Sequence, residues 1–308
     1  MANTLNLQDA LDEFSKNLGK RQISDNTRKA FWGDVNIFAR FLTEDDDGVV
    51  VGTTRADGDK HKQLETPPPP INTITAENIR AFLAHEEKRP NANSPKSLER
   101  RLTSLKVFFS WLRDSGKLGF DPAEGIAYKP FVDPLPEYLS EAEQVRVMDA
   151  ARHVATTERL DTRPLLAISV VLDTGIKKSE CLKLTVSDVD LTNRNVLIKY
   201  DKKHLEFKNR RLPISEECTE IVRGHIERYN ITGLLFDCTG RNLEYIFNRK
   251  VAPLAQLTAL TFEMLRWSCA LRDFKAGEMN TEQCEQKYGL SALGWAEMEA
   301  KLARILQT

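Results

Sequence analysis

The stretch that decides the fold is Leu172-Asp173-Thr174-Gly175-Ile176-Lys177-Lys178-Ser179-Glu180-Cys181-Leu182-Lys183-Leu184, and Asp188-Val189-Asp190 follows it. An apolar segment leads into this stretch from Arg163. Gly175 is the residue type that most readily ends a helix in the left-handed conformation. The pattern predicts a helix from about Arg163 to Asp173, a stop at Thr174-Gly175 and a pair of cations directly after it.

Downstream, residues that favour β-strands alternate with others from Asn195 to Tyr200. After a basic turn, Arg211–Ile214 forms a second such segment, which predicts a hairpin or small antiparallel sheet. From Arg194 to Arg211 there are seven basic residues and two acidic ones, although the net charge of the chain is −1. Such a local excess can bind phosphates while the whole protein stays nearly neutral. Later helices are expected over Glu216–Tyr229, Asn242–Leu254, Thr261–Lys275 and Trp295–Leu306.

Upstream, apolar residues at helical spacing predict four helices, over Leu7–Leu18 and Asp25–Leu42 and beginning near Thr75 and Ser94. In the last of these, Pro95 follows the capping serine in the first turn. The opposite face of this helix carries four basic side chains: Lys96, Arg100, Lys106 and Arg113. They form either a phosphate-binding surface or an ordinary solvated helix face.

The chain of 308 residues is longer than one hydrophobic core usually supports, so two domains are expected. We predict a mainly α-helical protein with a small antiparallel β-sheet in the second domain. A helical domain would cover residues 1–128, a proline-rich linker 129–138 and the second domain 139–308, where Ser140 and Glu143 form a capping box. Residues 44–73, which are acidic, then glycine-rich, then proline-rich, are expected to be an exposed, mobile insertion.

Composition excludes several classes of protein. Hydrophobic residues make up 41% and charged residues 29%, as in ordinary globular domains. No apolar run approaches the ~20 residues of a membrane span, and the N-terminus has no signal-peptide core, so a cytoplasmic protein is expected. The five cysteines and five histidines show no ligand spacing, which predicts reduced thiols, no metal and no cofactor.

The opening stretch resembles the first catalytic box of the tyrosine recombinases, the phage-integrase family, written roughly T-G-L-R-x-S-E-L-x-x-L and then D-x-D. The segment Arg210-Arg211-Leu212-Pro213-Ile214 is similar to that family's K-x-x-x-R-x-V-P-L. Asp121-Pro122-Ala123 and Leu139-Ser140-x-x-Glu143 also match in order and spacing. The resemblance implies a SAM-like helical core-binding domain and a DNA breaking-rejoining catalytic-type domain, which together clamp a DNA duplex.

In such enzymes a tyrosine attacks a DNA phosphodiester, two arginines stabilise the charge on phosphate and a hairpin lysine protonates the leaving oxygen. By resemblance, the first arginine position holds Lys177, which keeps the charge but lacks the planar guanidinium fork. The acidic partner is Glu180 and the second arginine is Arg266. Lys203 or Lys202 corresponds to the hairpin lysine.

Other catalytic positions differ from the family pattern. Where the family has H-x-L-R-H this sequence has Glu263-Met264-Leu265-Arg266-Trp267, and its L-G-H box appears as Tyr288-Gly289-Leu290. Glu263 would face the phosphate, and a like charge at ~4 Å costs on the order of 4 kcal/mol at an effective dielectric of 20. The nucleophile position falls near Glu299, and residues 289–308 contain no tyrosine.

The favoured hypothesis is therefore a DNA-binding member of this family with impaired catalysis, which acts in or regulates DNA integration or recombination. One alternative is an active site-specific recombinase with Tyr288 or Ser291 as nucleophile. Another is a recombinase-derived scaffold that binds other proteins through the C-terminal helix Trp295–Ile305. The expected partners are double-stranded DNA and further copies of the chain bound through that helix; no membrane or small-molecule partner is expected. The remaining candidate DNA contacts are Lys178, Lys202, Lys208, Arg210 and Arg211.

Overall fold

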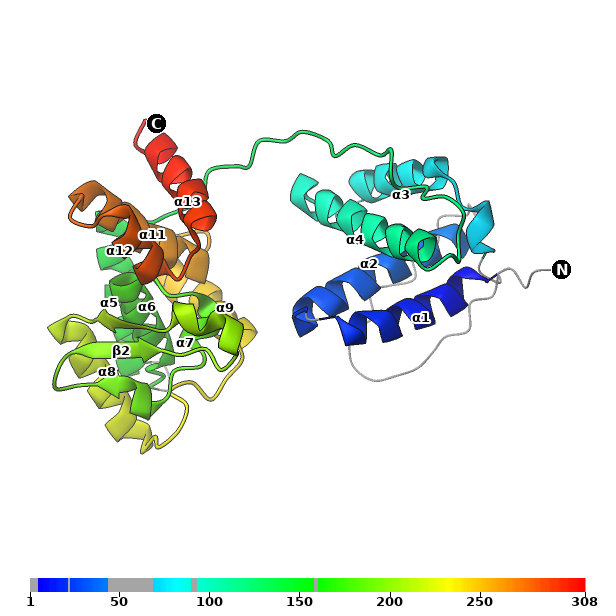
Figure 1. Ribbon diagram of the computed structural model, residues 1–308. Coiled ribbons are helices and arrows are strands. Elements are labelled where there is room, and N and C mark those ends of the chain that lie inside the picture. The colour runs from blue at the N-terminus through cyan, green and yellow to red at the C-terminus, as the bar shows by residue number, and fades with distance from the viewer. Residues whose placement is uncertain (1–4, 22, 44–68, 90–92, 158–159, 308) are drawn as a thin grey trace. The chain divides into compact units, whose positions relative to one another are not determined.

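The computed structural model describes residues 5–21, 23–43, 69–89, 93–157 and 160–307. The chain divides into two compact units, residues 1–132 and 133–308 (Figure 1). The first unit is built of helices, and the second combines helices with one small antiparallel sheet. The predicted fold class is confirmed. Within the described ranges, no helix combines the length and apolarity needed to span a bilayer.

The first unit consists of α1 (Leu7–Lys20), α2 (Asp25–Thr43), α3 (Ala76–Lys88) and α4 (Pro95–Asp114). Side-chain caps fix three of the helix starts, at Asn6, Thr75 and Ser94. The apolar faces meet in a core rich in phenylalanine, whose rings pack edge to face, as between Phe14 and Phe108. This regular amphipathic spacing is what made these helices predictable.

A buried charge network joins three of these helices. The carboxylate of Asp34 on α2 accepts hydrogen bonds from Arg100 and Ser104 on α4, and Glu86 on α3 pairs with Arg101 on α4 at 3.0 Å. Asp34, Glu86 and Arg101 are all buried. Because a buried charge without a partner is costly, each carboxylate fixes the position of α4 against its neighbour.

Most of the insertion predicted over residues 44–73 lies outside the described residues. Its C-terminal end does not behave as predicted. The amide of Leu7 donates to the carbonyl of Pro69, and the amide of Ile71 donates to the carbonyl of Leu5, both at 3.1 Å. Ile71 opens a short 3₁₀ turn, Ile71–Thr73, and is buried in the core. The prediction of an exposed segment was therefore wrong at Ile71, because this apolar residue among the prolines packs into the core of the first unit.

The second unit is organised around α6 (Arg163–Thr174), which is buried along most of its length. It packs against α5 (Glu141–Thr157), α8 (Glu216–Tyr229) and α11 (Phe262–Ala276). Gly175 ends α6 in the left-handed conformation, with φ of 64°, as predicted. The other helices of this unit are α7 (Lys178–Cys181), α9 (Gly240–Ile246), α10 (Ala252–Leu254), α12 (Thr281–Tyr288) and α13 (Ala292–Ile305).

The sheet has three antiparallel strands in the order β1-β2-β3: β1 (Val189–Asp190), β2 (Asn195–Ile198) and β3 (Arg210–Pro213). Val196 pairs with Leu212, and Ile198 pairs with Arg210. These four side chains all point into the unit, because residues directly opposite each other in a ladder share a face. The predicted hairpin is confirmed, and the two-residue strand β1 was not predicted.

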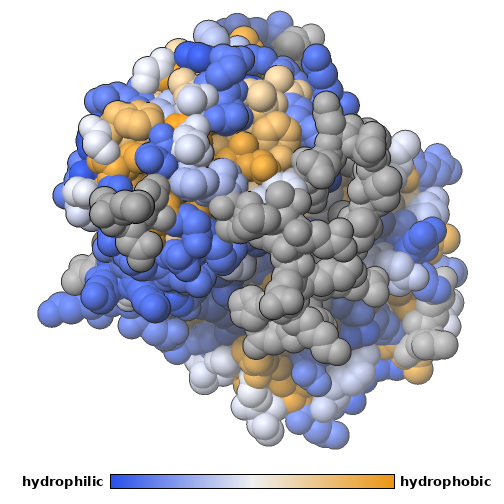
Figure 2. Space-filling view, turned by 90° about the vertical axis from the view of Figure 1, so that its right-hand side faces the viewer, coloured by the Kyte–Doolittle hydropathy of each residue, from blue (hydrophilic) through white to orange (hydrophobic). Residues whose placement is uncertain are grey.

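Two helical segments differ from the sequence prediction. The helix expected over Asn242–Leu254 begins at Gly240 and contains a π-helical turn, Phe247–Val251, between α9 and α10. The short helix α12 was not predicted, because only Cys284 and Tyr288 are buried in it and the pattern is too sparse to register as amphipathic. Figure 2 shows a mainly hydrophilic face with separate hydrophobic patches, in keeping with apolar residues largely enclosed in each unit's core.

Candidate functional site

Two of the predicted cations meet in one hollow of about 250 Å³ in the second unit. Lys177 reaches it from the segment between α6 and α7, and Arg266 reaches it from α11. Arg266 is only 5% exposed, so it is not an ordinary surface ion pair. The complete lining is Lys177, Glu263, Arg266, Trp267, Leu290, Gly294, Glu297, Met298 and Lys301.

The residues that the resemblance assigns to the family's histidine positions also lie in this hollow. Glu263, Trp267 and Leu290 all line it. Burial lowers the pKa of Arg266 from its ordinary value, and the negative charge of Glu263 partly offsets that shift. Glu263 is thus close enough to Arg266 to compete with an incoming phosphate for the guanidinium charge.

Glu180 forms a buried two-pronged ion pair with Arg210, in which both guanidinium nitrogens lie 3.0 Å from carboxylate oxygens. The hydroxyl of Tyr200 donates to the same carboxylate at 2.5 Å, and the amide of Lys177 donates at 2.8 Å. Burial alone would raise the pKa of Glu180, but the hydrogen bonds and charge of Arg210 outweigh it and lower the pKa. Glu180 is therefore a fixed anion that positions the start of α7.

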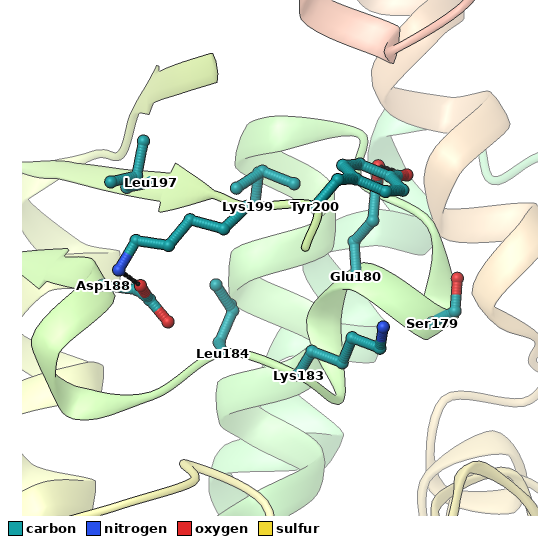
Figure 3. A pocket seen from close by; sticks show the side chains of 9 residues that line it. Ser179, Glu180, Lys183, Leu184, Asp188, Leu197, Lys199 and Tyr200 are labelled. Carbon is teal, nitrogen blue, oxygen red and sulfur yellow. Dashed lines mark hydrogen bonds and ion pairs between the residues drawn. The ribbon is translucent and has the colours of Figure 1, made fainter. Parts of the chain in front are cut away.

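The same cluster borders a second hollow of about 60 Å³ beside β2. In Figure 3, Tyr200 and Glu180 lie together at one end of it, and the ion pair between Lys199 and Asp188 lies at the other. Burial raises the pKa of Tyr200 to about 12, and its hydrogen bond to Glu180 acts in the same direction. Tyr200 therefore stays a protonated donor that supports the carboxylate.

The structure does not support a DNA contact for Arg210. Its side chain is buried because β3 directs it inward, opposite Ile198. Besides Glu180, its donors are taken by the carbonyl oxygens of Lys208, at 3.0 Å, and Lys287, at 2.8 Å. The other arginine of the pair, Arg211, is exposed on the outer face and donates a hydrogen bond to the side chain of Asn195.

The C-terminal end of α12 holds three cations of the site through consecutive main-chain carbonyls. Arg210 Nε donates to the oxygen of Lys287, Arg266 Nη2 to that of Tyr288 at 3.1 Å, and Lys177 Nζ to that of Gly289 at 3.4 Å. The last carbonyls of a helix have no partner within the helix, and the helix dipole makes this end negative. The end of α12 therefore attracts and spaces three positive side chains.

Tyr288 itself is fully buried, which argues against its use as a displaced nucleophile. Its hydroxyl donates to Asp273 at 2.5 Å and lies 3.6 Å from the sulfur of Cys269, and its ring stacks on Trp295. Burial raises the pKa of Tyr288 far above its ordinary value. The other alternative, Ser291, is exposed and caps α13 by accepting a hydrogen bond from the amide of Gly294.

The position assigned to the nucleophile, Glu299, does not line the hollow. The face of α13 that lines it carries Gly294, Glu297, Met298 and Lys301, at the spacing of successive helical turns. Glu299 lies on another face, where its charge acts on Cys284. Glu299 therefore lies outside the lining of this hollow, and its assignment to the nucleophile position stays a prediction.

The basic residues of the β2–β3 loop, residues 199–209, separate into two groups. Lys202 and Lys203 are exposed and have no hydrogen-bond or ion-pair partner for their side chains among the described residues. Neither lines the 250 Å³ hollow. Lys208 is half-buried, and its charge is one of those that help to lower the pKa of Lys177, after burial and Arg266. Lys178, at the start of α7, pairs with Glu244 at 2.9 Å.

On α4 in the first unit, the predicted basic face is partly occupied by internal contacts. Arg100 pairs with Asp34, and Arg113 pairs with Asp114 and Glu124. Lys106 lies over the ring of Tyr128, 4.7 Å from its centroid. Lys96 is exposed at the first turn of the helix. The two arginines are thus engaged with carboxylates of the first unit, and their DNA contacts stay a prediction.

Several residues of the site were not found from the sequence. Glu297 and Lys301 had a detectable signal, the helical spacing of α13 across from the predicted cations. Tyr200 was assigned only to a strand, and the carbonyls of residues 287–289 carry no side-chain signature at all. No group of His, Cys, Asp and Glu able to hold a metal occurs among the residues described in the structure.

Comparison with known proteins covers both units. Residues 137–281 match the sequence profile of the phage integrase family, and residues 10–115 match that of the phage integrase N-terminal SAM-like domain. Tyrosine recombinase XerC of a Mycobacterium species (strain JLS) is 27% identical over 221 residues, which cover 70% of this chain and 64% of that protein. The match thus spans less than two thirds of that relative's length.

Solved structures show the same fold. An integrase of the Tn1549 transposon in complex with transposon right end DNA has a TM-score of 0.71 at 15% identity, with 98% of each chain covered. A lambda integrase dimer bound to a COC′ core site has a TM-score of 0.70 at 16% identity, covering 98% of this chain and 79% of that one. At this level of identity the likeness concerns the fold alone.

Proposed function

Because this chain belongs to the phage integrase family of tyrosine recombinases, we propose that it binds double-stranded DNA in integration or recombination without supplying the attacking tyrosine itself. The observation that carries the proposal is the meeting of Lys177 and Arg266 in one hollow with no tyrosine hydroxyl among its lining residues. Such a site can hold a phosphate by charge and hydrogen bonds, yet has no group of the usual kind to cleave it.

The phosphate-binding role rests on how the cations are held. Burial and the neighbouring charge of Arg266 lower the pKa of Lys177, and burial lowers the pKa of Arg266. An anion placed between two partly desolvated cations stabilises both of them, because it reduces their mutual repulsion. The α12 carbonyls relieve part of this repulsion when no anion is bound. A DNA phosphate is the anion that the family relationship and the exposed lysines of the β2–β3 loop favour.

The proposed loss of cleavage rests on three side chains. Glu263 adds a negative charge to the hollow, Leu290 stands at the position that the resemblance gives to a histidine donor, and Tyr288 is fully buried and does not line the hollow. Arg266 and Glu180 keep the family's residue types, and they are held rigidly. The arrangement therefore favours positioning of DNA over strand cleavage.

The test is the binding of a short duplex DNA measured by fluorescence anisotropy across a salt series. We expect the affinity to fall about a hundredfold or more between about 50 and 200 mM salt, because several counterions are released from DNA on binding. A flat dependence, or no binding at the lowest salt, would overturn the proposal.

Two double variants test whether the lysines of the β2–β3 loop contact DNA phosphates. Lys202→Ala with Lys203→Ala should reduce the slope of log affinity against log salt by about 2, one for each phosphate contact. The matched control is Arg228→Ala with Lys275→Ala, which removes the same charge from exposed positions close in sequence to Glu227 and Glu278. The control should leave the slope unchanged.

We further propose that more than one copy assembles on DNA through α13. In the isolated chain the apolar face of α13, with Trp295, Leu302 and Ile305, is packed into the unit's own core. Assembly would therefore need α13 to leave that core or to bind through its outer face. Analytical ultracentrifugation with and without DNA tests this, and a monomer under both conditions at high concentration would contradict it.

A further inference from the structure

The β2–β3 loop carries an exposed aromatic side chain among its lysines. Phe207 is 68% exposed, although full burial of a phenylalanine is worth about 1.5–3 kcal/mol. Within the part of the chain that the structure describes, the side chains of Lys202 and Lys203 on this loop have no hydrogen-bond or ion-pair partner, and Lys208 Nζ lies 5.5 Å from the Phe207 ring centroid. Phe207 belongs to none of the hydrophobic core clusters of the two units.

We propose that Phe207 is a DNA-contacting wedge that stacks on a base displaced from the duplex, while the lysines beside it bind the flanking phosphates. This inference rests on the proposed DNA-binding function and adds a specific role for one residue. Aromatic side chains stack on unpaired bases, and apolar wedges inserted between base steps unstack and kink DNA. The loop combines both requirements in one segment, an exposed apolar side chain and a local excess of positive charge.

The charges of the loop favour DNA over a protein partner. An apolar contact with another protein would be best framed by neutral or mixed polar residues, since charged residues are depleted at the centre of protein interfaces. Phe207 has lysines at 202, 203 and 208 on both sides of it in sequence, which outnumber the two acidic residues of the loop, Asp201 and Glu206. A polyanion with flat, stackable bases satisfies both the lysines and the ring.

The loop geometry also gives Phe207 a defined position. The 3₁₀ turn Lys203–Lys208 is closed by hydrogen bonds from the amide of Leu205 to the carbonyl of Lys202, at 2.7 Å, and from the amide of Asn209 to that of Glu206, at 2.9 Å. The side chain of Asn209 then accepts from the amide of Tyr200 at 2.7 Å, which joins the two ends of the loop. Phe207 is therefore presented on a closed turn.

The experiment compares two probes: a short intact duplex and the same duplex with one unpaired adenine at its centre. A wedge gains most where the base is already free, because the energy of unstacking is then not required. We expect the wild-type protein to bind the bulged duplex about tenfold more tightly, and Phe207→Ala to lose that preference, as stacking on one base is worth about that factor or more. Phe207→Trp should retain it, because indole also stacks.

The matched control is Val145→Ala. Val145 is another exposed apolar residue, 61% exposed, but it lies on α5 with Glu141 and Asp149 one turn away on either side. This substitution should leave both affinities unchanged. The salt slope on intact duplex should be the same for the wild type and Phe207→Ala, since no charge is removed.

The outcomes separate the two proposals. If the wild type shows steep salt dependence but Phe207→Ala keeps the same preference for the bulged duplex, the wedge is overturned and DNA binding stands. If the wild type prefers neither probe yet binds both with steep salt dependence, the wedge is again overturned. A flat salt series for the wild type removes the proposed function and the wedge with it.

Discussion

Arg266 donates from Nη2 to the main-chain carbonyl of Tyr288, 3.1 Å away, while the Tyr288 hydroxyl donates to Asp273 on the helix that carries Arg266. The two residues therefore hold each other, one by its side chain and the other by its main chain. Both residues are buried, so the hydrogen bond from Arg266 is shielded from water. This reciprocal arrangement fixes the position of Arg266 and explains why Tyr288 is a supporting residue.

The glycine that ends α12 gives a first prediction. Gly289 has φ of +58°, and a Cβ there would lie 2.8 Å from Arg210 Nη1. Gly289→Ala should destabilise the second unit by about 1–3 kcal/mol in urea unfolding, through backbone strain and displacement of Arg210. Gly277→Ala is the matched control, because Gly277 also has positive φ, +65°, but open space around it. Equal losses in the two variants would contradict the clash.

The buried pair of Glu180 and Arg210 gives a second prediction. Glu180→Gln should lower the free energy of unfolding by about 3–5 kcal/mol, because it leaves the guanidinium buried without its counter-charge. Glu217→Gln removes one partner of the exposed pair with Arg152, and should change stability by about 0–1 kcal/mol. Urea titrations followed by circular dichroism compare the two. A loss for Glu180→Gln no larger than for Glu217→Gln would show that the buried pair is not required.

Local chemistry made much of the fold predictable from sequence. The stop at Gly175, the capping box at Ser140 and the amphipathic helices of the first unit follow from short-range rules. The inward direction of Arg210 could not be predicted, because strand register decides it and a shift of one residue would reverse it. The contacts from the end of α12 were equally inaccessible, since main-chain carbonyls look the same in every sequence.

The charge of Glu263 gives a third prediction. Glu263→His should tighten binding to duplex DNA about tenfold at low salt, equivalent to ~1.4 kcal/mol, by removing an anion from the hollow that holds Lys177 and Arg266. Glu278→His, at an exposed position that does not line the hollow, is the control for overall charge. If both substitutions tighten binding equally, the effect belongs to net charge and not to the site.

The burial of Tyr288 gives a fourth prediction. Nicked suicide DNA substrates should trap no covalent adduct with either the wild type or Tyr288→Phe, because the hydroxyl is enclosed between Asp273 and Cys269. The variant should instead lose about 1–3 kcal/mol of stability, the value of a buried hydrogen bond to a charged group. An adduct that forms with the wild type and disappears in Tyr288→Phe would restore the hypothesis of a displaced nucleophile.

A buried histidine gives the fifth prediction, on pH. Burial lowers the pKa of His225 below its ordinary value of 6.5, and its ring nitrogens bond to Thr162 and to the carbonyl of Leu235. Because the folded-state pKa is depressed, its stabilising contribution is complete above the unfolded pKa and is lost as pH falls through the folded one. The melting temperature of the wild type should therefore fall more steeply below about pH 6.5 than that of His225→Gln. Parallel profiles would assign the acid sensitivity to other groups.

The main-chain carbonyls at the end of one short helix, α12, bind three charged side chains of the site, so that the position of α12 controls all three. Any partner or ligand that tilts α12 moves Lys177, Arg210 and Arg266 together, since all three are tethered to neighbouring carbonyls. The affinity of the hollow for a phosphate would then change in one step, because the three side chains would move together. One movement of this helix could then bind or release a phosphate at the hollow.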